Sequence, residues 1–293
     1  MTSTDQWDIV SSVGLTALGV AAARAIDSAR EDALVHDPLA ERFVELAQPP
    51  TPLPTRPEHL GTGTEAGKWG WTADFMGIRS RYFDELFAEA TADGVRQVVV
   101  LAAGLDVRAQ RLDWPADCHV FEVDQPRVLE FKDEVLAETG AQQGCQRHLV
   151  RADLREDWSR ALLAAGFDPS RPTAWLAEGL LTYLPAQAQE QLFDTVRRLS
   201  APGSRIGVEY VRDMPTLLAH PKFRGSTDQF GVDLGELWNR EPRRAAEDQL
   251  RDLGWTVEVE HGREVATRYG RALDPDAGAM IGEHGILLSG RLP

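Results

Sequence analysis

Residues 98–124 read VVVLAAGLDVRAQRLDWPADCHVFEVD, and this stretch decides the fold. It opens with four apolar residues, Val98 to Leu101, as a strand does when both faces of a parallel sheet are covered. Ala102, Ala103 and Gly104 follow, and such small residues let the backbone of a strand-to-helix turn approach a ligand closely. The stretch therefore predicts a buried strand that leads into a binding turn.

A second short apolar segment ends in Asp124, about twenty residues after the turn, as in a nucleotide-binding βαβ unit. A carboxylate there can accept hydrogen bonds from both ribose hydroxyls. The G-x-G-x-x-G of a dinucleotide site is absent, because Ala102, Asp106 and Ala109 replace its glycines. Asp106 would also repel a pyrophosphate at the helix N-terminus. S-adenosylmethionine, which has a nucleoside and a sulfonium but no phosphate, fits better; the alternative is an ordinary βαβ turn with a surface aspartate.

Length and composition limit the classes of protein to which the chain can belong. The chain has 293 residues, of which 43% are hydrophobic and 26% charged, so it can bury the core of one large α/β domain. A formal net charge of -15 argues against nucleic acid as a partner. Two cysteines, Cys118 and Cys145, make no disulfide framework. No signal peptide or membrane-length apolar run is found, so we expect a cytoplasmic protein without membrane contacts.

The N-terminal part, residues 1–71, predicts a helical cap and a lid. Apolar residues recur at helical spacing over 13–29, and Asp37 followed by Pro38 favours the start of a second helix. Residues 49–67 contain five prolines and three glycines, which predicts a long loop that is either a lid or disordered.

The remaining chain alternates between helical and strand patterns, which predicts a single domain, residues 1–293, with a doubly wound sheet. Its core is expected at 72–211, and the irregular, polar segment 212–243 is expected to face the substrate within a C-terminal part, 212–293. Helices are expected at 72–92, 126–138, 185–199 and 245–253, and further strands at 146–150, 172–177, 205–211, 255–259 and 286–289, the last two as an antiparallel pair.

Polar side chains near the predicted strands are candidate ligand contacts. Arg79 or Arg81, in the helix before the first strand, can bind a carboxylate with two parallel hydrogen bonds, although either also suits a solvated surface. Asp153 and Leu154 follow the third strand, where a carboxylate suits the adenine amino group and an apolar side chain suits the ring. Alternatively, Asp153 caps a helix that begins near Arg155.

Seven segments in a fixed order carry a resemblance to a known family: WDIVSSVGLTALGVAAARA (7–25), IRSRYFDELF (78–87), QVVVLAAGLDVRAQRL (97–112), FEVDQP (121–126), RADLREDW (151–158), AWLAEGLLTYLP (174–185) and LSAPGSR (199–205). They resemble the leucine carboxyl methyltransferase-like family, in particular its bacterial branch of S-adenosyl-L-methionine-dependent methyltransferases. The resemblance implies a Rossmann-like class I methyltransferase with a seven-stranded, mostly parallel sheet, an antiparallel last strand, an N-terminal helical cap and lid insertions.

The resemblance also implies which residues hold the cofactor, S-adenosyl-L-methionine. In the eukaryotic members the first turn resembles G-A-G, whereas this chain has Ala102 in place of the first glycine. The methyl group of Ala102 should narrow the cofactor pocket slightly. The implied contacts are Arg79 for the methionine carboxylate, the turn Ala102, Ala103 and Gly104, Asp124 for the ribose, Asp153 and Leu154 for the adenine, and Glu178 near the methionine end.

The expected reaction is O-methylation of a carboxylate or a hydroxyl on a small molecule. Methyl transfer from a sulfonium mainly requires donor and acceptor to be held in line in a dry pocket. An ionised carboxylate needs no general base, whereas a hydroxyl needs one, for which Glu178 and Tyr183 are candidates. A non-catalytic protein that binds the cofactor and an NAD-binding dehydrogenase remain alternatives. The seven histidines lack metal-ligand spacing, so no metal is expected.

Overall fold

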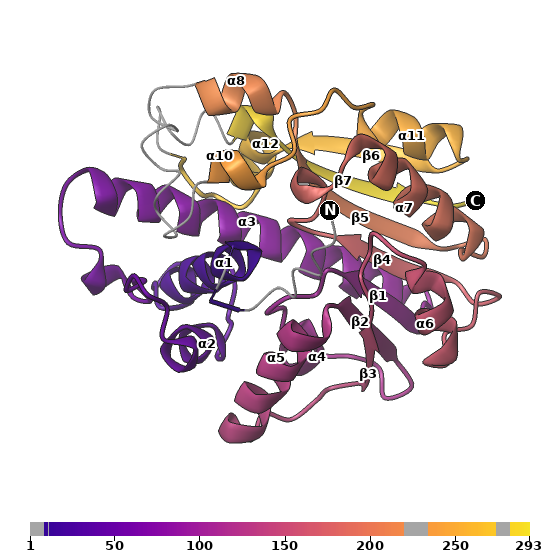
Figure 1. Cartoon of the computed structure of the whole chain (residues 1–293), viewed down its shortest axis with the longest axis horizontal. Coiled ribbons are helices and arrows are strands. Elements are labelled where there is room, and N and C mark those ends of the chain that lie inside the picture. The colour runs from indigo at the N-terminus through magenta and orange to yellow at the C-terminus, as the bar shows by residue number, and fades with distance from the viewer. Residues whose placement is uncertain (1–8, 11, 220–233, 274–281) are drawn as a thin grey trace, which may run out of the picture.

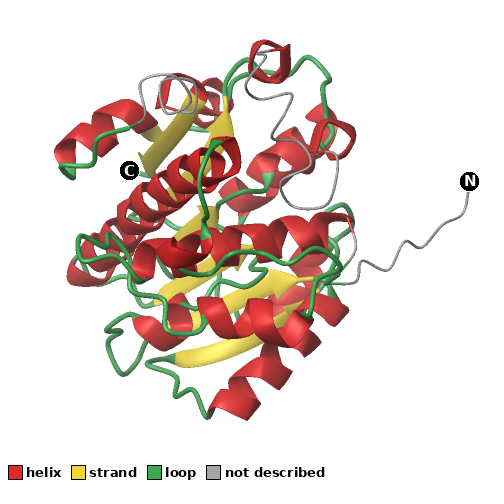
Figure 2. Ribbon diagram, turned by 90° about the vertical axis from the view of Figure 1, so that its left-hand side faces the viewer, coloured by secondary structure: helices red, strands yellow, loops and turns green. Residues whose placement is uncertain are grey.

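The computed structural model describes residues 9, 10, 12–219, 234–273 and 282–293. A seven-stranded sheet in the order β3-β2-β1-β4-β5-β7-β6 lies at its centre, with helices on both faces (Figures 1 and 2). Neighbouring strands are parallel except at β7, which runs antiparallel to both β5 and β6. The strands are β1 (Gln97–Leu101), β2 (His119–Asp124), β3 (Gln146–Arg151), β4 (Thr173–Ala177), β5 (Arg205–Val211), β6 (Thr256–His261) and β7 (Gly285–Arg291).

Helices before the sheet form a cap, and those after β1 alternate with the strands. The cap contains α1 (Ser12–Ser28), α2 (Ala40–Ala47), the 3-10 turn η1 (Pro57–His59) and the start of the long helix α3 (Thr64–Ala92). The later helices are α4 (Arg108–Arg111), α5 (Pro126–Thr139), α6 (Trp158–Ala164), η2 (Leu181–Tyr183), α7 (Ala186–Arg198), α8 (Met214–Ala219), α10 (Leu234–Leu237), α11 (Ala246–Asp252) and α12 (Gly262–Arg268).

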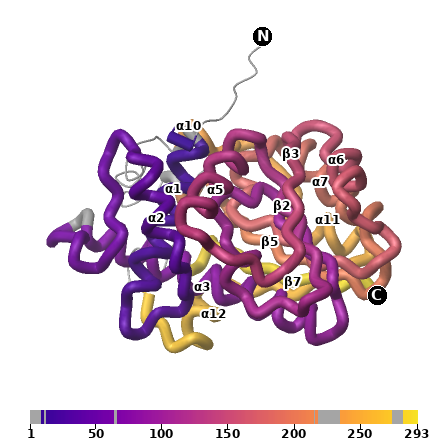
Figure 3. Tube along the Cα trace, turned by 90° about the horizontal axis from the view of Figure 1, so that it is seen from below, coloured from indigo at the N-terminus to yellow at the C-terminus, as the bar shows by residue number. Residues whose placement is uncertain are grey.

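The apolar run of β1 supplies both faces of the sheet. Val99 and Leu101 belong to the core shared with α6, α7 and α11, whereas Val98 and Val100 belong to the core shared with α3 and α12. Successive side chains of a strand point to opposite faces, so a strand covered on both sides must be apolar throughout. A further core joins α1, α2, the start of α3 and α5, and Figure 3 shows this cap beside one end of the domain.

The predicted seven-stranded sheet and its antiparallel final pair are confirmed, as are the helices at α1, α5, α7 and α11. The long helix α3 begins at Thr64 instead of the predicted Thr72, so the end of the expected loop is helical. Trp69 explains the difference, because its side chain is buried in the core of the cap. The segment 212–243 was predicted to be irregular, but α8 and α10 are helical; residues 220–233 lie outside the described part.

The sequence did not predict α12, which follows β6 directly and packs against α3. A capping box at His261 and Glu264 starts this helix. In the described part of the chain, no helix is long and apolar enough to span a membrane.

A buried carboxylate fixes the cap to the domain. Asp27, in the last turn of α1, is fully buried and accepts hydrogen bonds from the backbone N–H groups of Leu34 (2.9 Å) and Val35 (3.1 Å) and from Arg271 Nη2 (3.2 Å). Gly77 of α3 faces it, and a Cβ at this position would lie 2.7 Å from the carboxylate. The helices can approach closely because Gly77 has no side chain.

We expect Gly77→Ala to lower the free energy of unfolding by about 1–3 kcal/mol, because the added methyl displaces a buried, hydrogen-bonded carboxylate. Gly70→Ala, in the same helix, is the matched control, since its Cβ would meet nothing within 4 Å. This control should stabilise the protein by about 0.5–1 kcal/mol through helix propensity. Urea denaturation measures both values, and equal effects at the two sites would contradict the packing described for Asp27.

Candidate active site

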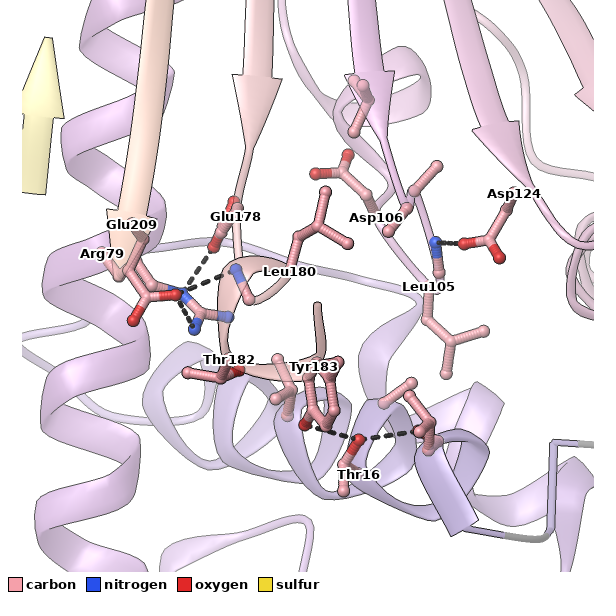
Figure 4. A pocket seen from close by; sticks show the side chains of 18 of the residues that line it. Thr16, Arg79, Leu105, Asp106, Asp124, Glu178, Leu180, Thr182, Tyr183 and Glu209 are labelled. Atoms are coloured by element: carbon pink, nitrogen blue, oxygen red, sulfur yellow. Dashed lines mark hydrogen bonds and ion pairs between the residues drawn. The ribbon is translucent and has the colours of Figure 1, made fainter. Parts of the chain in front are cut away.

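A cavity of about 330 Å³ opens at the carboxyl ends of β1, β2, β4 and β5. The strand order reverses between β1 and β4, and ligands of open α/β sheets bind at such a switch point. Figure 4 shows side chains from these strand ends together with Thr16 of the cap. All the predicted cofactor residues line this cavity, namely Arg79, Ala102, Ala103, Gly104, Asp124, Asp153, Leu154 and Glu178.

The turn after β1 is closed by Asp124 at the end of β2. The carboxylate accepts the N–H of Gly104 through Oδ2 (2.6 Å) and the N–H of Gln125 through Oδ1 (2.7 Å). Each oxygen keeps a further acceptor site, because an ionised carboxylate offers about four. Gly104 has φ +49°, and Ala102 has φ +52°. Ala102 therefore takes a left-handed conformation that glycine adopts freely and that costs an alanine about 1–2 kcal/mol.

Burial affects the charge of Asp124. It raises the pKa of this carboxyl to about 6, although the N–H groups of Gly104 and Gln125 act in the opposite direction. The carboxylate is thus ionised at neutral pH and becomes protonated in mildly acidic solution.

Arg79 of α3 links the carboxylates that end two neighbouring strands (Figure 4). Its Nε donates to Glu178 Oε1 (2.7 Å), after β4, and its Nη1 donates to Glu209 Oε2 (3.5 Å), in β5. The other candidate, Arg81, pairs with Glu85 (3.0 Å) on the exposed side of α3, where 43% of its side chain is accessible. Of the two candidates, Arg79 therefore lines the cavity and Arg81 does not.

Glu178 is held on both oxygens. Arg108 Nη1 donates to Glu178 Oε2 (2.8 Å), and Arg108 also pairs with Asp84 (2.7 Å between Nε and Oδ1) and with Asp106. Burial would raise the pKa of Glu178, but Arg108 and Arg79 outweigh it and lower that pKa. Burial likewise opposes ionisation of Asp106, but Arg108 leads the groups that lower its pKa to about 2.

Sequence reasoning did not identify Arg108 or Glu209 as site residues. Arg108 is one of two arginines in the short helix α4, and its three carboxylate partners come from α3, from the turn and from the segment after β4. Glu209 has a clearer signal, because it is the one carboxylate in the mostly apolar strand RIGVEYV; in the folded chain it is only 5% exposed. Its Oε2 also accepts the N–H of Gly179 (2.9 Å), and burial raises its pKa.

Tyr183, a candidate catalytic residue, contacts the cap. Its hydroxyl donates to Thr16 Oγ1 (3.1 Å), and Thr16 donates to the carbonyl of Val13 (2.7 Å), so α1 is bound directly to the site (Figure 4). Burial raises the pKa of Tyr183. A phenol with a raised pKa stays protonated at neutral pH, which does not suit a general base.

Asp153 and Leu154 lie after β3, at the other end of the cavity. Asp153 accepts hydrogen bonds from Gln125 Nε2 (3.1 Å) and from the N–H of Arg155 (2.9 Å), and it pairs with the Arg155 guanidinium. Helix α6 begins only at Trp158, so Asp153 orders a local turn and is not the cap of that helix.

The expected lid does not cover this cavity in the described structure. The segment 49–63 packs on the outer side of α2, where Thr55 and Arg56 both bind Glu41 at 2.8–2.9 Å. The walls opposite the strand ends come from α1, from α3 with Trp71 and Phe75, and from Leu217 and Trp238. Among the described residues no cluster of three or more His, Cys, Asp or Glu side chains could hold a metal ion.

Comparison with solved structures agrees with this architecture. A crystal structure of a "putative methyltransferase" from Thermobifida fusca superposes with a TM-score of 0.54 at 21% identity and covers 92% of this chain and 94% of its own. The sheet order with an antiparallel β7, the helical N-terminus and this likeness define a Rossmann-like class I methyltransferase fold.

Sequence comparisons then place the chain in a family. The profile of leucine carboxyl methyltransferase matches residues 17–197, and the chain belongs to this family. A relative from Saccharopolyspora erythraea, named "Putative S-adenosyl-L-methionine-dependent methyltransferase", is 47% identical over 99% of both chains. A similarly named relative from Rhodococcus jostii is 48% identical over 94% of this chain and 93% of its own. The protein is an S-adenosyl-L-methionine-dependent methyltransferase, as the resemblance predicted.

Proposed function

We propose that the protein transfers a methyl group from S-adenosyl-L-methionine to a carboxylate or hydroxyl oxygen of a small molecule. The observation that carries this proposal is Asp124, which closes a left-handed turn after β1 and keeps free acceptor sites in a cavity at the switch point of the sheet. Such a carboxylate is suited to the two hydroxyls of a ribose.

The other strand ends suit the two ends of the cofactor. Leu154 offers an apolar contact for the adenine ring, and Asp153 offers a carboxylate for its amino group. At the methionine end, Arg79 suits the α-carboxylate and Glu178 suits the ammonium group. Arg79 can donate further hydrogen bonds to this carboxylate, because only its Nε makes a short bond (2.7 Å), whereas its Nη1 contact with Glu209 is 3.5 Å long.

The bound cofactor would supply a methyl group that its sulfonium already activates. The chain would supply position and a dry environment: the strand ends fix the donor, and the apolar walls from α1 and α3 exclude water from the acceptor. Methyl transfer in which the cofactor supplies the activated methyl group and the chain positions the two reactants requires no metal.

The geometry disfavours a ligand with a pyrophosphate. Asp106 lies at the turn before α4, and its carboxylate is ionised because Arg108 lowers its pKa. A pyrophosphate there would meet a negative charge in place of the N–H groups of a glycine-rich turn. A role as a non-catalytic sensor of the cofactor is distinguished from catalysis by whether any methyl transfer is detected.

We expect Asp124→Ala to weaken binding of S-adenosylmethionine and S-adenosylhomocysteine by about 1.5–3 kcal/mol, roughly ten- to a hundredfold. The reason is the loss of paired hydrogen bonds from a buried, charged group. Titration calorimetry measures the effect, with Asp113→Ala as the control, because Asp113 is exposed on the connection between β1 and β2. Equal affinities for the two variants would contradict the ribose contact, and no binding to the wild-type protein would overturn the proposed function.

Cofactor affinity should also depend on pH. The pKa of Asp124 in the folded protein is about 6, so the carboxylate is ionised above this pH and loses its charge below it. Because the ribose hydroxyls bind the ionised form, affinity should be constant near neutral pH and fall by up to about tenfold per pH unit below pH 6. Calorimetry across this range should show the decline in the wild type and its absence in Asp124→Asn. A flat wild-type profile would refute this assignment.

A further inference from the structure

We propose that the methyl acceptor is a hydroxyl group on a largely apolar molecule and that Glu209 accepts its proton. This inference rests on the proposed function and deepens it, because it chooses between the two acceptor classes and adds a catalytic residue.

Glu209 has one oxygen that the fold uses and one that it does not. Oε2 accepts the N–H of Gly179 (2.9 Å) and the Nη1 of Arg79 (3.5 Å). Oε1 has no hydrogen-bond partner among the described residues, although Glu209 lines the cavity and is 5% exposed. An acceptor atom on the wall of the cavity can accept a hydrogen bond from a ligand hydroxyl.

The alternative bases near the strand ends are already engaged. Glu178 binds Arg79 through Oε1 and Arg108 through Oε2, and these arginines hold it in its ionised, weakly basic form. The Tyr183 hydroxyl already donates a hydrogen bond to Thr16 Oγ1, and it carries its proton at neutral pH. Glu209 is therefore the carboxylate of the site whose free oxygen can take a proton.

The charges of the cavity disfavour a carboxylate acceptor. Each guanidinium that lines it in the described structure is paired with a carboxylate of the protein, and six carboxylates line it against five guanidiniums. Once the cofactor carboxylate is bound at Arg79, a carboxylate acceptor would add a buried anion balanced only by the sulfonium of the donor, which is costly, whereas a neutral hydroxyl adds no charge. The guanidiniums are Arg24, Arg79, Arg108, Arg111 and Arg155, and the carboxylates are Asp37, Asp106, Asp124, Asp153, Glu178 and Glu209.

The walls on the acceptor side suit an apolar skeleton. They contain Val13 and Val20 of α1, Phe75 and Met76 of α3, and Leu217 of α8. Pockets with apolar walls and few polar groups fix the orientation of a ligand through those polar groups. Here Glu209 Oε1 is the polar group that would fix the hydroxyl.

The chemical step balances without another reactant. The hydroxyl oxygen forms a bond to the methyl carbon, the bond between that carbon and sulfur breaks, and its electron pair stays on the sulfur, which becomes neutral. The hydroxyl proton goes to Glu209 Oε1. The groups that face Glu209 are Arg79 from α3, Glu178 after β4, the N–H of Gly179 and, in η2, Tyr183. Burial raises the pKa of Glu209, which makes it a stronger proton acceptor.

Binding to the protein saturated with S-adenosylhomocysteine tests the acceptor class directly. Calorimetric titration would compare matched pairs that differ only in the reacting group: phenol and benzoate, naphthol and naphthoate, phenylphenol and phenylbenzoate. We expect the hydroxyl member of at least one pair to bind at least about tenfold more tightly than its carboxylate partner. Tighter or equal binding of the carboxylates, or no binding of any hydroxyl, would overturn the inference.

Glu209→Gln tests the role of the side chain, because the amide oxygen still accepts the N–H of Gly179 but cannot take a proton. We expect this variant to lose the preference for hydroxyls and to slow methyl transfer to the bound hydroxyl by about a hundredfold or more. Glu247→Gln is the control: Glu247 is also a buried carboxylate, bonded to Tyr210 outside the cavity, and its replacement should change neither value.

If Glu209→Gln transferred the methyl group at the wild-type rate, the proposed role of Glu209 would be overturned. These outcomes are separate from a failure of the proposed function, in which S-adenosylhomocysteine itself would not bind to the wild-type protein.

Discussion

The ion pairs of Arg79 join parts of the chain that are far apart in sequence. Arg79 reaches from α3 to Glu178 after β4 and to Glu209 in β5, and all three side chains are largely buried. A buried charge without a partner is strongly destabilising, so the long helix can adopt only positions that keep this guanidinium between the two strand ends. Because α3 also packs on α1 and begins within the cap, the same contact fixes the cap against the sheet.

The cavity follows from this arrangement. The strand ends supply charged groups that are already paired, the turn after β1 supplies closely approaching backbone, and the cap supplies apolar walls. Asp124 has two roles: it closes the turn by accepting two N–H groups, and it retains acceptor sites for a ligand. These contacts within the chain hold the turn and the strand ends in place, which lowers the entropic cost of binding.

Much of this could be predicted from sequence because the signals are local. The run VVVL, the small residues after it and Asp124 at the next strand end are each a short local pattern, and they led to the correct sheet and to residues that line one cavity. The start of α3 could not be found in this way. Residues 61–70, GTGTEAGKWG, have the composition of a loop, and the burial of Trp69 in the cap is a tertiary contact that composition does not show.

The residues that were missed depend on tertiary contacts. Arg108 carries no local signal, because three carboxylates from separate elements converge on it only in the folded chain. Glu209 has a local signal, as a carboxylate in a mostly apolar strand, but only the packing of α3 on this face shows that it is buried beside Arg79. The lid was predicted from proline content, but those prolines belong to a segment that packs on α2 away from the cavity.

A crystal structure of the protein with S-adenosylhomocysteine would show whether these strand ends form the cofactor site. We expect both ribose hydroxyls at about 2.5–3.0 Å from the Asp124 carboxylate and the methionine carboxylate on the Arg79 guanidinium. A nucleoside bound away from Asp124, with Arg79 contacting only Glu178 and Glu209, would contradict it.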